Sequence, residues 1–159
     1  MFRLARALSP KFARPDNKWA RNILSAAEFS VFSRMDARDR EHAIRVTKKL
    51  IVLYPDSTLI LQRAALLHDC GKLVRPYSVI ERVLVGIFYS VPSAGLDNLD
   101  IPDFSLISAE QVKRYHPQIG AQLILEAGGN ARVAEIVGKH HVPGNDLEAQ
   151  RIHEVDELE

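Results

Sequence analysis

The chain has 159 residues, of which 47% are apolar and 26% are charged, a composition typical of one globular domain. No stretch approaches the roughly 18 uninterrupted apolar residues of a membrane-spanning helix, so membrane-spanning, collagen-like and disordered classes are excluded. The 21 Lys and Arg residues nearly balance the 20 Asp and Glu residues. This balance lacks the uniform basic field of nucleic-acid-binding proteins, so no stable nucleic-acid binding is expected. The single cysteine, Cys70, predicts a cytoplasmic protein without internal disulfides.

Residues 1–24 form a basic N-terminal arm, with six basic residues against one acidic residue. The arm has neither the apolar core nor the cleavage site of a secretory signal. We expect it to be solvated and partly frayed. A weak contact with an anionic membrane surface is the alternative, because apolar side chains stand between its basic residues. The main domain is then expected to cover residues 25–159.

The rest of the chain reads as a series of helices, and no stretch shows the sustained alternation of a half-buried strand, so the predicted fold class is all-α. The first three helices begin at side chains that cap helix N-termini: Ser25, Asp36 and Ser57. The second helix is predicted to run to about Tyr54. The third is predicted to end at His68 and Asp69, with Gly71 in the position that follows a helix C-terminus.

A strongly apolar helix is predicted over residues 78–91, followed by a loop over 92–103. Core packing is the favoured interpretation of this helix, and a membrane-surface or dimer contact is the alternative. Four further helices have predicted start signals. These are a capping box of Ser108 and Gln111, Pro117 as a first helical residue, Asn130 as the cap of 131–141, and Asp146 as the cap of 147–158.

Five of the six histidines lie on helix faces that also carry the apolar stripe: His42, His68, His116, His140 and His141. A single buried histidine usually finds backbone partners, but five converging rings need a shared partner. A divalent metal satisfies several ring nitrogens at once, and Asp69 and Asp156 add carboxylates. Imidazole and carboxylate without thiolate favour one or two ions of Mn, Fe, Co, Ni or Zn in a site with open positions.

The segment 64–72, AALLHDCGK, resembles the signature of the HD-domain metal-dependent phosphohydrolases, an all-helical superfamily. Segments 41–46, EHAIRV, and 155–158, VDEL, resemble the family's first and last ligand motifs. HPQIG at 116–120 and KHH at 139–141 resemble motifs of the subgroup that includes cyclic-dinucleotide phosphodiesterases and binds two metals. The resemblance implies an HD-type helical bundle with the metal site at its centre.

The resemblance also implies a ligand set for each ion. One ion would take His42, His68, Asp69 and Asp156, and the other Asp69, His116, His140 and His141. A metal-bound hydroxide would then attack the phosphorus of a phosphodiester or phosphomonoester. As further catalytic residues, Lys72 is expected to contact a phosphate oxygen, and Arg45 to do the same or to hold a carboxylate.

Two departures from the family pattern bear on the substrate. No Gly-Tyr-Pro follows His141, so the best-known cyclic-di-GMP signature is absent, and Arg38 stands where some relatives carry an extra acidic ligand. The short connection between His141 and Asp156 leaves little loop to enclose a large dinucleotide. A small phosphorylated substrate, a nucleotide above all, is expected. The alternatives are a di-iron oxygenase of the same fold and a non-catalytic interaction module.

Overall fold

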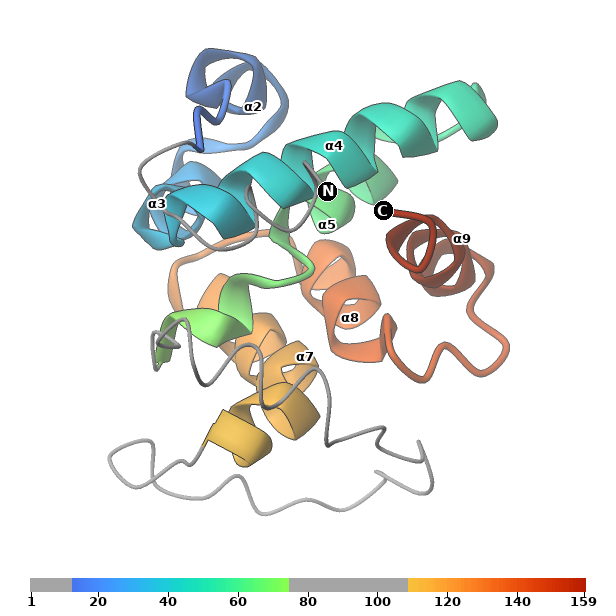
Figure 1. Cartoon of the computed structure of the whole chain (residues 1–159). Helices are drawn as coiled ribbons and strands as arrows, with labels where there is room; N and C mark the ends of the chain where they lie inside the picture. The colour runs from blue at the N-terminus through green and yellow to red at the C-terminus, as the bar shows by residue number, and fades with distance from the viewer. Residues whose placement is uncertain (1–12, 75–108) are drawn as a thin grey trace, which may run out of the picture.

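The computed structural model describes residues 13–74 and 109–159 (Figure 1). Every regular element in these two ranges is a helix, so the all-α prediction is confirmed. The first half of the basic arm, the predicted apolar helix 78–91, the loop 92–103 and the Ser108 cap lie outside the described residues. Among the helices described, none combines the length and hydropathy that a membrane span requires.

Seven α-helices and one 3-10 helix follow one another along the described chain. They are α2 (Asn17–Ile23), α3 (Ala26–Arg34), α4 (Ala37–Leu53), α5 (Leu59–Leu67), η2 (Cys70–Val74), α7 (Ala109–Glu126), α8 (Ala131–Lys139) and α9 (Leu147–Asp156).

The predicted helix starts are confirmed at four caps: Ser25, Asp36, Asn130 and Asp146. At each of them the side chain accepts a hydrogen bond from a backbone N–H of the first turn, which has no partner inside the helix. The prediction of Ser57 as the next cap is wrong. Thr58 caps α5 instead, and its hydroxyl accepts from the N–H of Leu61 at 3.1 Å.

Helix α2 lies inside the segment that was expected to be a solvated arm. Asp16 caps it through the N–H of Trp19, and α2 packs against α3 and α5. Ala20 and Leu24 are buried and belong to the main hydrophobic core. Residues 17–24 are therefore packed against the domain, because their apolar positions are covered by neighbouring helices.

Two predicted helix boundaries are wrong. Pro117 does not begin a helix, because α7 runs without a break from Ala109 to Glu126 with the proline inside it. Gly71 does not take the left-handed conformation at the end of α5, since only Gly128 and Gly144 have positive φ among the described residues. The chain continues after α5 into η2, and Gly71 is used for a close approach to α7.

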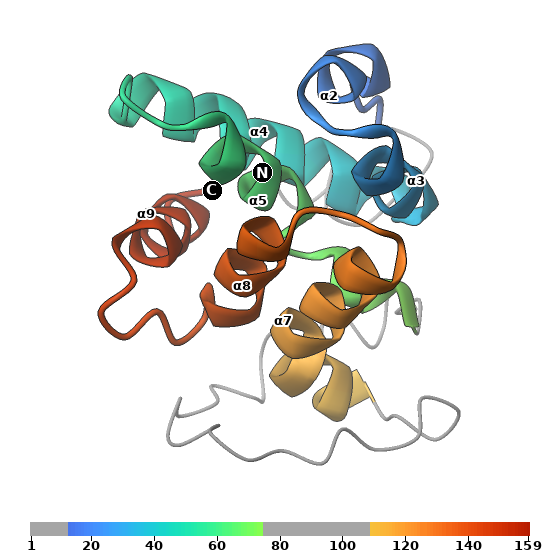
Figure 2. The ribbon, with the colours of Figure 1, turned by 180° about the vertical axis from the view of Figure 1, so that it is seen from behind.

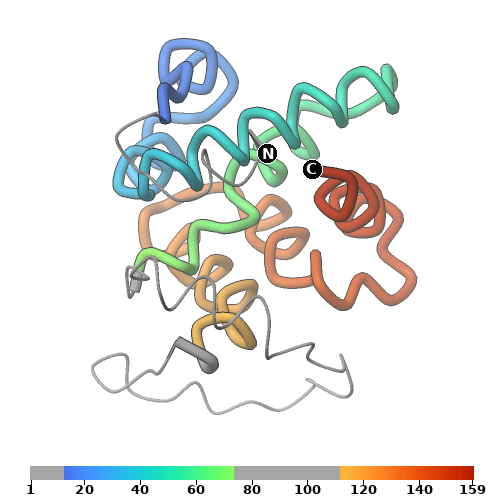
Figure 3. The backbone as a smooth tube through the Cα atoms, in the orientation of Figure 1, coloured from blue at the N-terminus to red at the C-terminus, as the bar shows by residue number. Residues whose placement is uncertain are grey.

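The core surrounds α5 and α8, which pack against each other. Helix α4 covers α5 on one side, and α7 packs against both α8 and η2 (Figures 1 and 2). Helix α9 lies beside α8 and contacts α4, so the last helix closes against an early one (Figure 3). In this arrangement the C-terminal ends of α5 and α8 both lie inside the protein.

Candidate metal centre

The apolar helix α5 ends at two polar residues that remain inside the protein. Its buried residues include Leu66 and Leu67, and the next two side chains, His68 and Asp69, are 0% and 4% exposed. A buried carboxylate and imidazole are costly unless they have partners. The end of α5 therefore marks the polar centre of an otherwise apolar core.

Five histidine rings form a continuous row through this centre. The ring centroids of His42 and His68 are 5.5 Å apart, and those of His68 and His140 are 5.3 Å apart. The row continues from His140 to His116 at 5.4 Å, and His141 lies 4.6 Å from His116. The structure thus brings together all five histidines singled out in the sequence, from α4, α5, α7 and the end of α8.

Three of these rings are held in the same way by backbone carbonyls. Nδ1–H of His68 donates to the carbonyl oxygen of Ala65 at 2.8 Å, and Nδ1–H of His140 donates to that of Val137 at 2.8 Å. Nδ1–H of His116 donates to the carbonyl oxygen of Lys113 at 3.0 Å. A carbonyl can only accept, so Nδ1 carries the hydrogen in all three rings.

Within the described residues, the opposite nitrogen of each of these rings makes no hydrogen bond. This nitrogen is the buried Nε2 of His68, His116 and His140. An orphaned buried nitrogen costs about 1–3 kcal/mol. In a neutral ring with hydrogen on Nδ1, that nitrogen presents a lone pair, which is the arrangement of a metal-ligating histidine whose other nitrogen is fixed by a carbonyl. These residues therefore fit a metal ion.

Pro117 contributes to the orientation of His116. In a helix the N–H of residue 117 would donate to the carbonyl of Lys113, but proline has no N–H. That carbonyl accepts from the His116 ring instead. Because Pro117 does not use the carbonyl of Lys113, that carbonyl is available to hold the ring of the neighbouring His116.

Asp69 lies between two groups of possible ligands. Its Oδ1 is 3.3 Å from Nε2 of His116, and its Oδ2 is 3.6 Å from Nε2 of His68. We call His116, His140 and His141 the three-histidine half, because their ligand atoms all lie within 4.8 Å of one another. His42, His68 and Asp69 form a second such group.

Asp156 completes the second group from the end of α9. Its Oδ1 lies 2.8 Å from Nε2 of His42 and 3.4 Å from Nε2 of His68. We call His42, His68 and Asp156 the carboxylate half, with Asp69 shared between the two halves. The sixth histidine, His153, belongs to neither group.

The two halves differ in their electrostatics. Burial lowers the pKa of His68, but Asp69 and Asp156 outweigh it and raise that pKa to about 9. Burial and the neighbouring rings lower the pKa of His140 far below its usual value, and burial lowers that of His141 to about 3. The carboxylate half therefore attracts positive charge, whereas the three-histidine half offers neutral imidazoles.

Lys72 and Arg45 were both expected at the site, and the structure places them differently. Nζ of Lys72 is 2.6 Å from Oδ2 of Asp69, so the ammonium is at the centre. Nε of Arg45 donates to Glu159 at 3.2 Å, and its Nη1 lies 3.6 Å from Glu41. Arg45 thus holds carboxylates, which was the second of its two predicted roles.

Asp39 is a buried carboxylate that the sequence analysis missed. It lies on the first turn of α4 and is 9% exposed. Burial lowers the pKa of Lys72, but the charges of Asp69 and, next, Asp39 outweigh burial and raise it. The signal was present in the sequence, since Asp39 stands three residues before His42 and shares its helix face.

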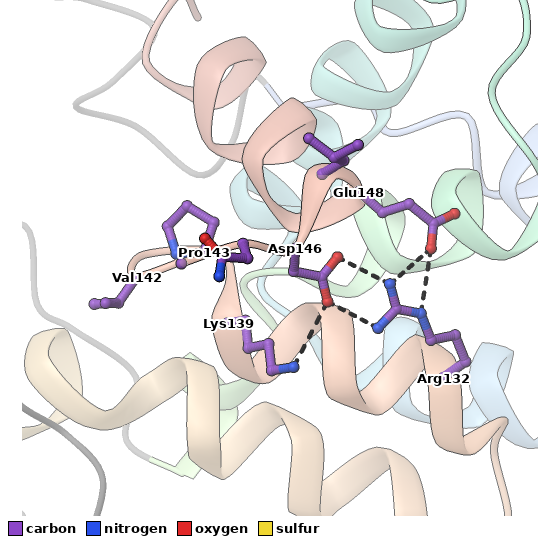
Figure 4. Close-up of a pocket in the computed structure, with 9 residues that line it drawn as sticks. Arg132, Lys139, Val142, Pro143, Asp146 and Glu148 are labelled. Carbon is purple, nitrogen blue, oxygen red and sulfur yellow. Dashed lines mark hydrogen bonds and ion pairs between the residues drawn. The ribbon is translucent and has the colours of Figure 1, made fainter.

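The loop after His141 is tied back to α8. Arg132 donates two hydrogen bonds of 2.8 Å to the carboxylate of Asp146, and Nζ of Lys139 lies 3.7 Å from the same carboxylate (Figure 4). A surface hollow beside this loop is lined by Arg132, Lys139 and residues 142–148. The hollow contains none of the clustered histidines, so it is separate from the candidate centre.

Comparison with known families agrees with this geometry. A family model described as the HD domain matches residues 40–159, which include all seven predicted ligands. Comparisons with curated proteins and with solved structures gave no match. Three-quarters of the chain is covered by the family model, and the clustered His and Asp side chains are suited to hold metal. The chain therefore belongs to the HD domain family, which consists largely of phosphohydrolases.

Proposed function

We propose that this protein is a metal-dependent phosphohydrolase with two ions, acting on a small phosphorylated substrate such as a nucleotide. The observation that carries the proposal is the set of three buried Nε2 atoms, on His68, His116 and His140, that make no hydrogen bond within the described residues. Each ring is fixed by a backbone carbonyl that accepts from its Nδ1–H, and Nε2 of His68 and of His116 lies within 3.6 Å of an oxygen of Asp69. A purely structural core has no need of such rings.

The proposed ligands follow the two halves of the centre. One ion is assigned to the carboxylate half together with Asp69, and the other to the three-histidine half together with Asp69. The two oxygens of Asp69 face different halves, which suits a bridging carboxylate. Four side chains for each ion leave open positions for water and substrate on a six-coordinate metal such as Mn.

When bound, divalent ions in such a site lower the pKa of water and neutralise charge on phosphoryl oxygens. The protein's own residues supply orientation. Carbonyls of Ala65 and Val137 fix the rings of His68 and His140, and the buried surroundings limit competing water. Lys72 lies with about a quarter of its side chain exposed, so its ammonium can also meet a phosphate oxygen of a substrate.

Hydrolysis assays on protein of defined metal content test this proposal. Metal-stripped protein reloaded with Mn²⁺ is expected to hydrolyse nitrophenyl phosphate esters, and a panel of nucleotides, cyclic nucleotides and cyclic dinucleotides then identifies the substrate class. Asp69→Ala is expected to lose turnover and bound metal together, because both halves share this residue. Asp56→Ala is the matched control, since Asp56 is an exposed carboxylate that contacts Arg151.

His116→Ala tests the two-ion assignment separately. It is expected to remove mainly the ion of the three-histidine half, which metal analysis would record as a fall from two ions to about one. Unchanged stoichiometry would contradict the assignment. Full turnover in Asp69→Ala, or oxygen uptake by an iron-loaded protein without ester hydrolysis, would contradict the phosphohydrolase proposal.

A further inference from the structure

Lys72 is directed at the metal centre by the backbone itself. The N–H of Lys72 donates to the carbonyl oxygen of Asp69 at 3.0 Å, which closes the first turn of η2. The turn folds the lysine back along the chain, and its Nζ reaches Oδ2 of Asp69 at 2.6 Å. This ion pair therefore joins two residues of the same turn.

The ammonium takes one particular oxygen of the shared carboxylate. Oδ2 is the oxygen that faces His68, at 3.6 Å from its Nε2, whereas Oδ1 faces His116. Lys72 therefore lies on the side of the carboxylate half. Burial lowers the pKa of His116 and His141 and the Lys72 charge also lowers it, but the direct contact of Lys72 is with Oδ2.

We propose that Lys72 competes with the metal ion of the carboxylate half for Oδ2 of Asp69, so that this ion binds more weakly than the ion of the three-histidine half. The inference rests on the proposed function. Two cations on one buried carboxylate oxygen repel each other strongly, because the surroundings screen charge poorly. The arriving ion must therefore displace the ammonium.

Other carboxylates besides Asp69 act on the Lys72 charge, so negative charge remains around a displaced ammonium. Asp39 and Asp156 both act on the charge of Lys72, and Asp39 is itself buried. Lys72 can leave Oδ2 without losing all negative neighbours. Its side chain then becomes available to a substrate phosphate at the moment when both ions are present. In this way Lys72 links binding of the ion in the carboxylate half to binding of the substrate phosphate.

Metal titration of the whole protein tests the proposal. Metal-stripped wild-type protein is titrated with Mn²⁺ in a calorimeter beside Lys72→Met and the control Lys48→Met. Lys48 is an exposed lysine on α4 that lies over the Trp19 ring, so its removal deletes the same charge away from the centre. Thermal melting of each metal-free variant shows that it is folded.

Wild-type protein is expected to bind a tighter and a weaker ion. Lys72→Met is expected to tighten the weaker step by about tenfold or more and to leave the tighter step within about twofold. Lys48→Met should match the wild type in both steps. In a His42→Ala background, which lacks a ligand of the carboxylate half, the effect of Lys72→Met should vanish. A second ion that binds only in Lys72→Met also supports the competition.

Unchanged or weaker binding of both ions by folded Lys72→Met would overturn the inference and leave the proposed function intact. Tightening of both steps alike would overturn it too, because the lysine would then act as a general charge. If Lys72→Met does not fold, Lys72→Gln replaces it with the same criteria. A wild-type protein that binds no Mn²⁺, Zn²⁺ or Fe²⁺ would overturn the proposed function itself, together with this inference.

Discussion

Gly71 is the point where the segment after Asp69 meets the helix that carries His116. A Cβ atom built on Gly71 would overlap the carbonyl oxygen of His116 and would lie 2.7 Å from the backbone nitrogen of Gly120. Both obstacles are backbone atoms of α7, which cannot turn aside as a side chain can. Gly71→Ala therefore forces η2 and α7 apart by roughly 1 Å or more.

The size of the effect follows from this displacement. Overpacking against rigid neighbours costs about 2–3 kcal/mol. In a chain of this length, that loss lowers the melting temperature by roughly 5–10 °C. The same movement separates Asp69 from His116, which are 3.3 Å apart between Oδ1 and Nε2. Metal sites require placement within about 0.5 Å, so we expect metal affinity to fall by about tenfold to a hundredfold.

Gly144→Ala provides the matched control. Gly144 has a φ of 54°, so alanine is strained there, but no atom in the described part of the chain lies within 4 Å of the added Cβ. The expected cost is about 1–2 kcal/mol, with no movement of the metal ligands. Both variants should melt below the wild type in chelator, while added Mn²⁺ should raise the melting temperature of Gly144→Ala as much as that of the wild type.

The assay is thermal unfolding with and without Mn²⁺, together with metal content by mass spectrometry. Gly71→Ala is expected to show a much smaller metal-dependent rise. A Gly71→Ala protein that melts lower but keeps the wild-type metal content and the full rise would refute the reasoning. It would show that the close approach of Gly71 does not set the spacing of Asp69 and His116.

Two further predictions concern stability away from the centre. The hydrogen bonds from Arg132 lower the pKa of Asp146 in the folded protein. The carboxylate therefore stabilises the fold fully above about pH 4, and this stabilisation is lost as the pH falls through the folded-state pKa of Asp146. The destabilisation by Asp146→Asn in urea unfolding should therefore be largest near neutral pH and shrink on acidification; a pH-independent difference would contradict this. Glu28 is fully buried, accepts the N–H of Asn130 and lies 3.6 Å from Arg63. Glu28→Ala should cost about 3 kcal/mol in urea unfolding, and a loss below about 1 kcal/mol would count against its role.

Local signals explain what the sequence could predict. The caps at Asp36, Asn130 and Asp146 were found because a capping side chain bonds the backbone two or three residues away. Thr58 was missed for its neighbour Ser57 because both carry hydroxyls and only the path of the chain decides between them. The convergence of the histidines was predicted because His68, His116 and His140 continue the buried faces of their helices, while His42 and His141 lie beside such faces.

The errors arose where tertiary structure overrides local preference. Proline is common at the first position of a helix, yet α7 continues through Pro117. Its missing N–H leaves the carbonyl of Lys113 free to accept from the His116 ring. Gly71 suits a helix end, but its use lies in a contact with α7, a helix that follows later in the chain. The contact of Arg45 with Glu159 was also beyond the sequence, because Glu159 meets α4 only after α9 has packed.

The two halves of the centre differ in the separation of their parts along the chain. The three-histidine half needs α7 and α8, which follow each other directly. The carboxylate half joins His42 to Asp156, 114 residues away. Closing so long a loop is slow, because its entropy is lost before any contact compensates. During refolding, the three-histidine half is therefore expected to form first. Binding of the ion of the carboxylate half should then occur only when α9 docks.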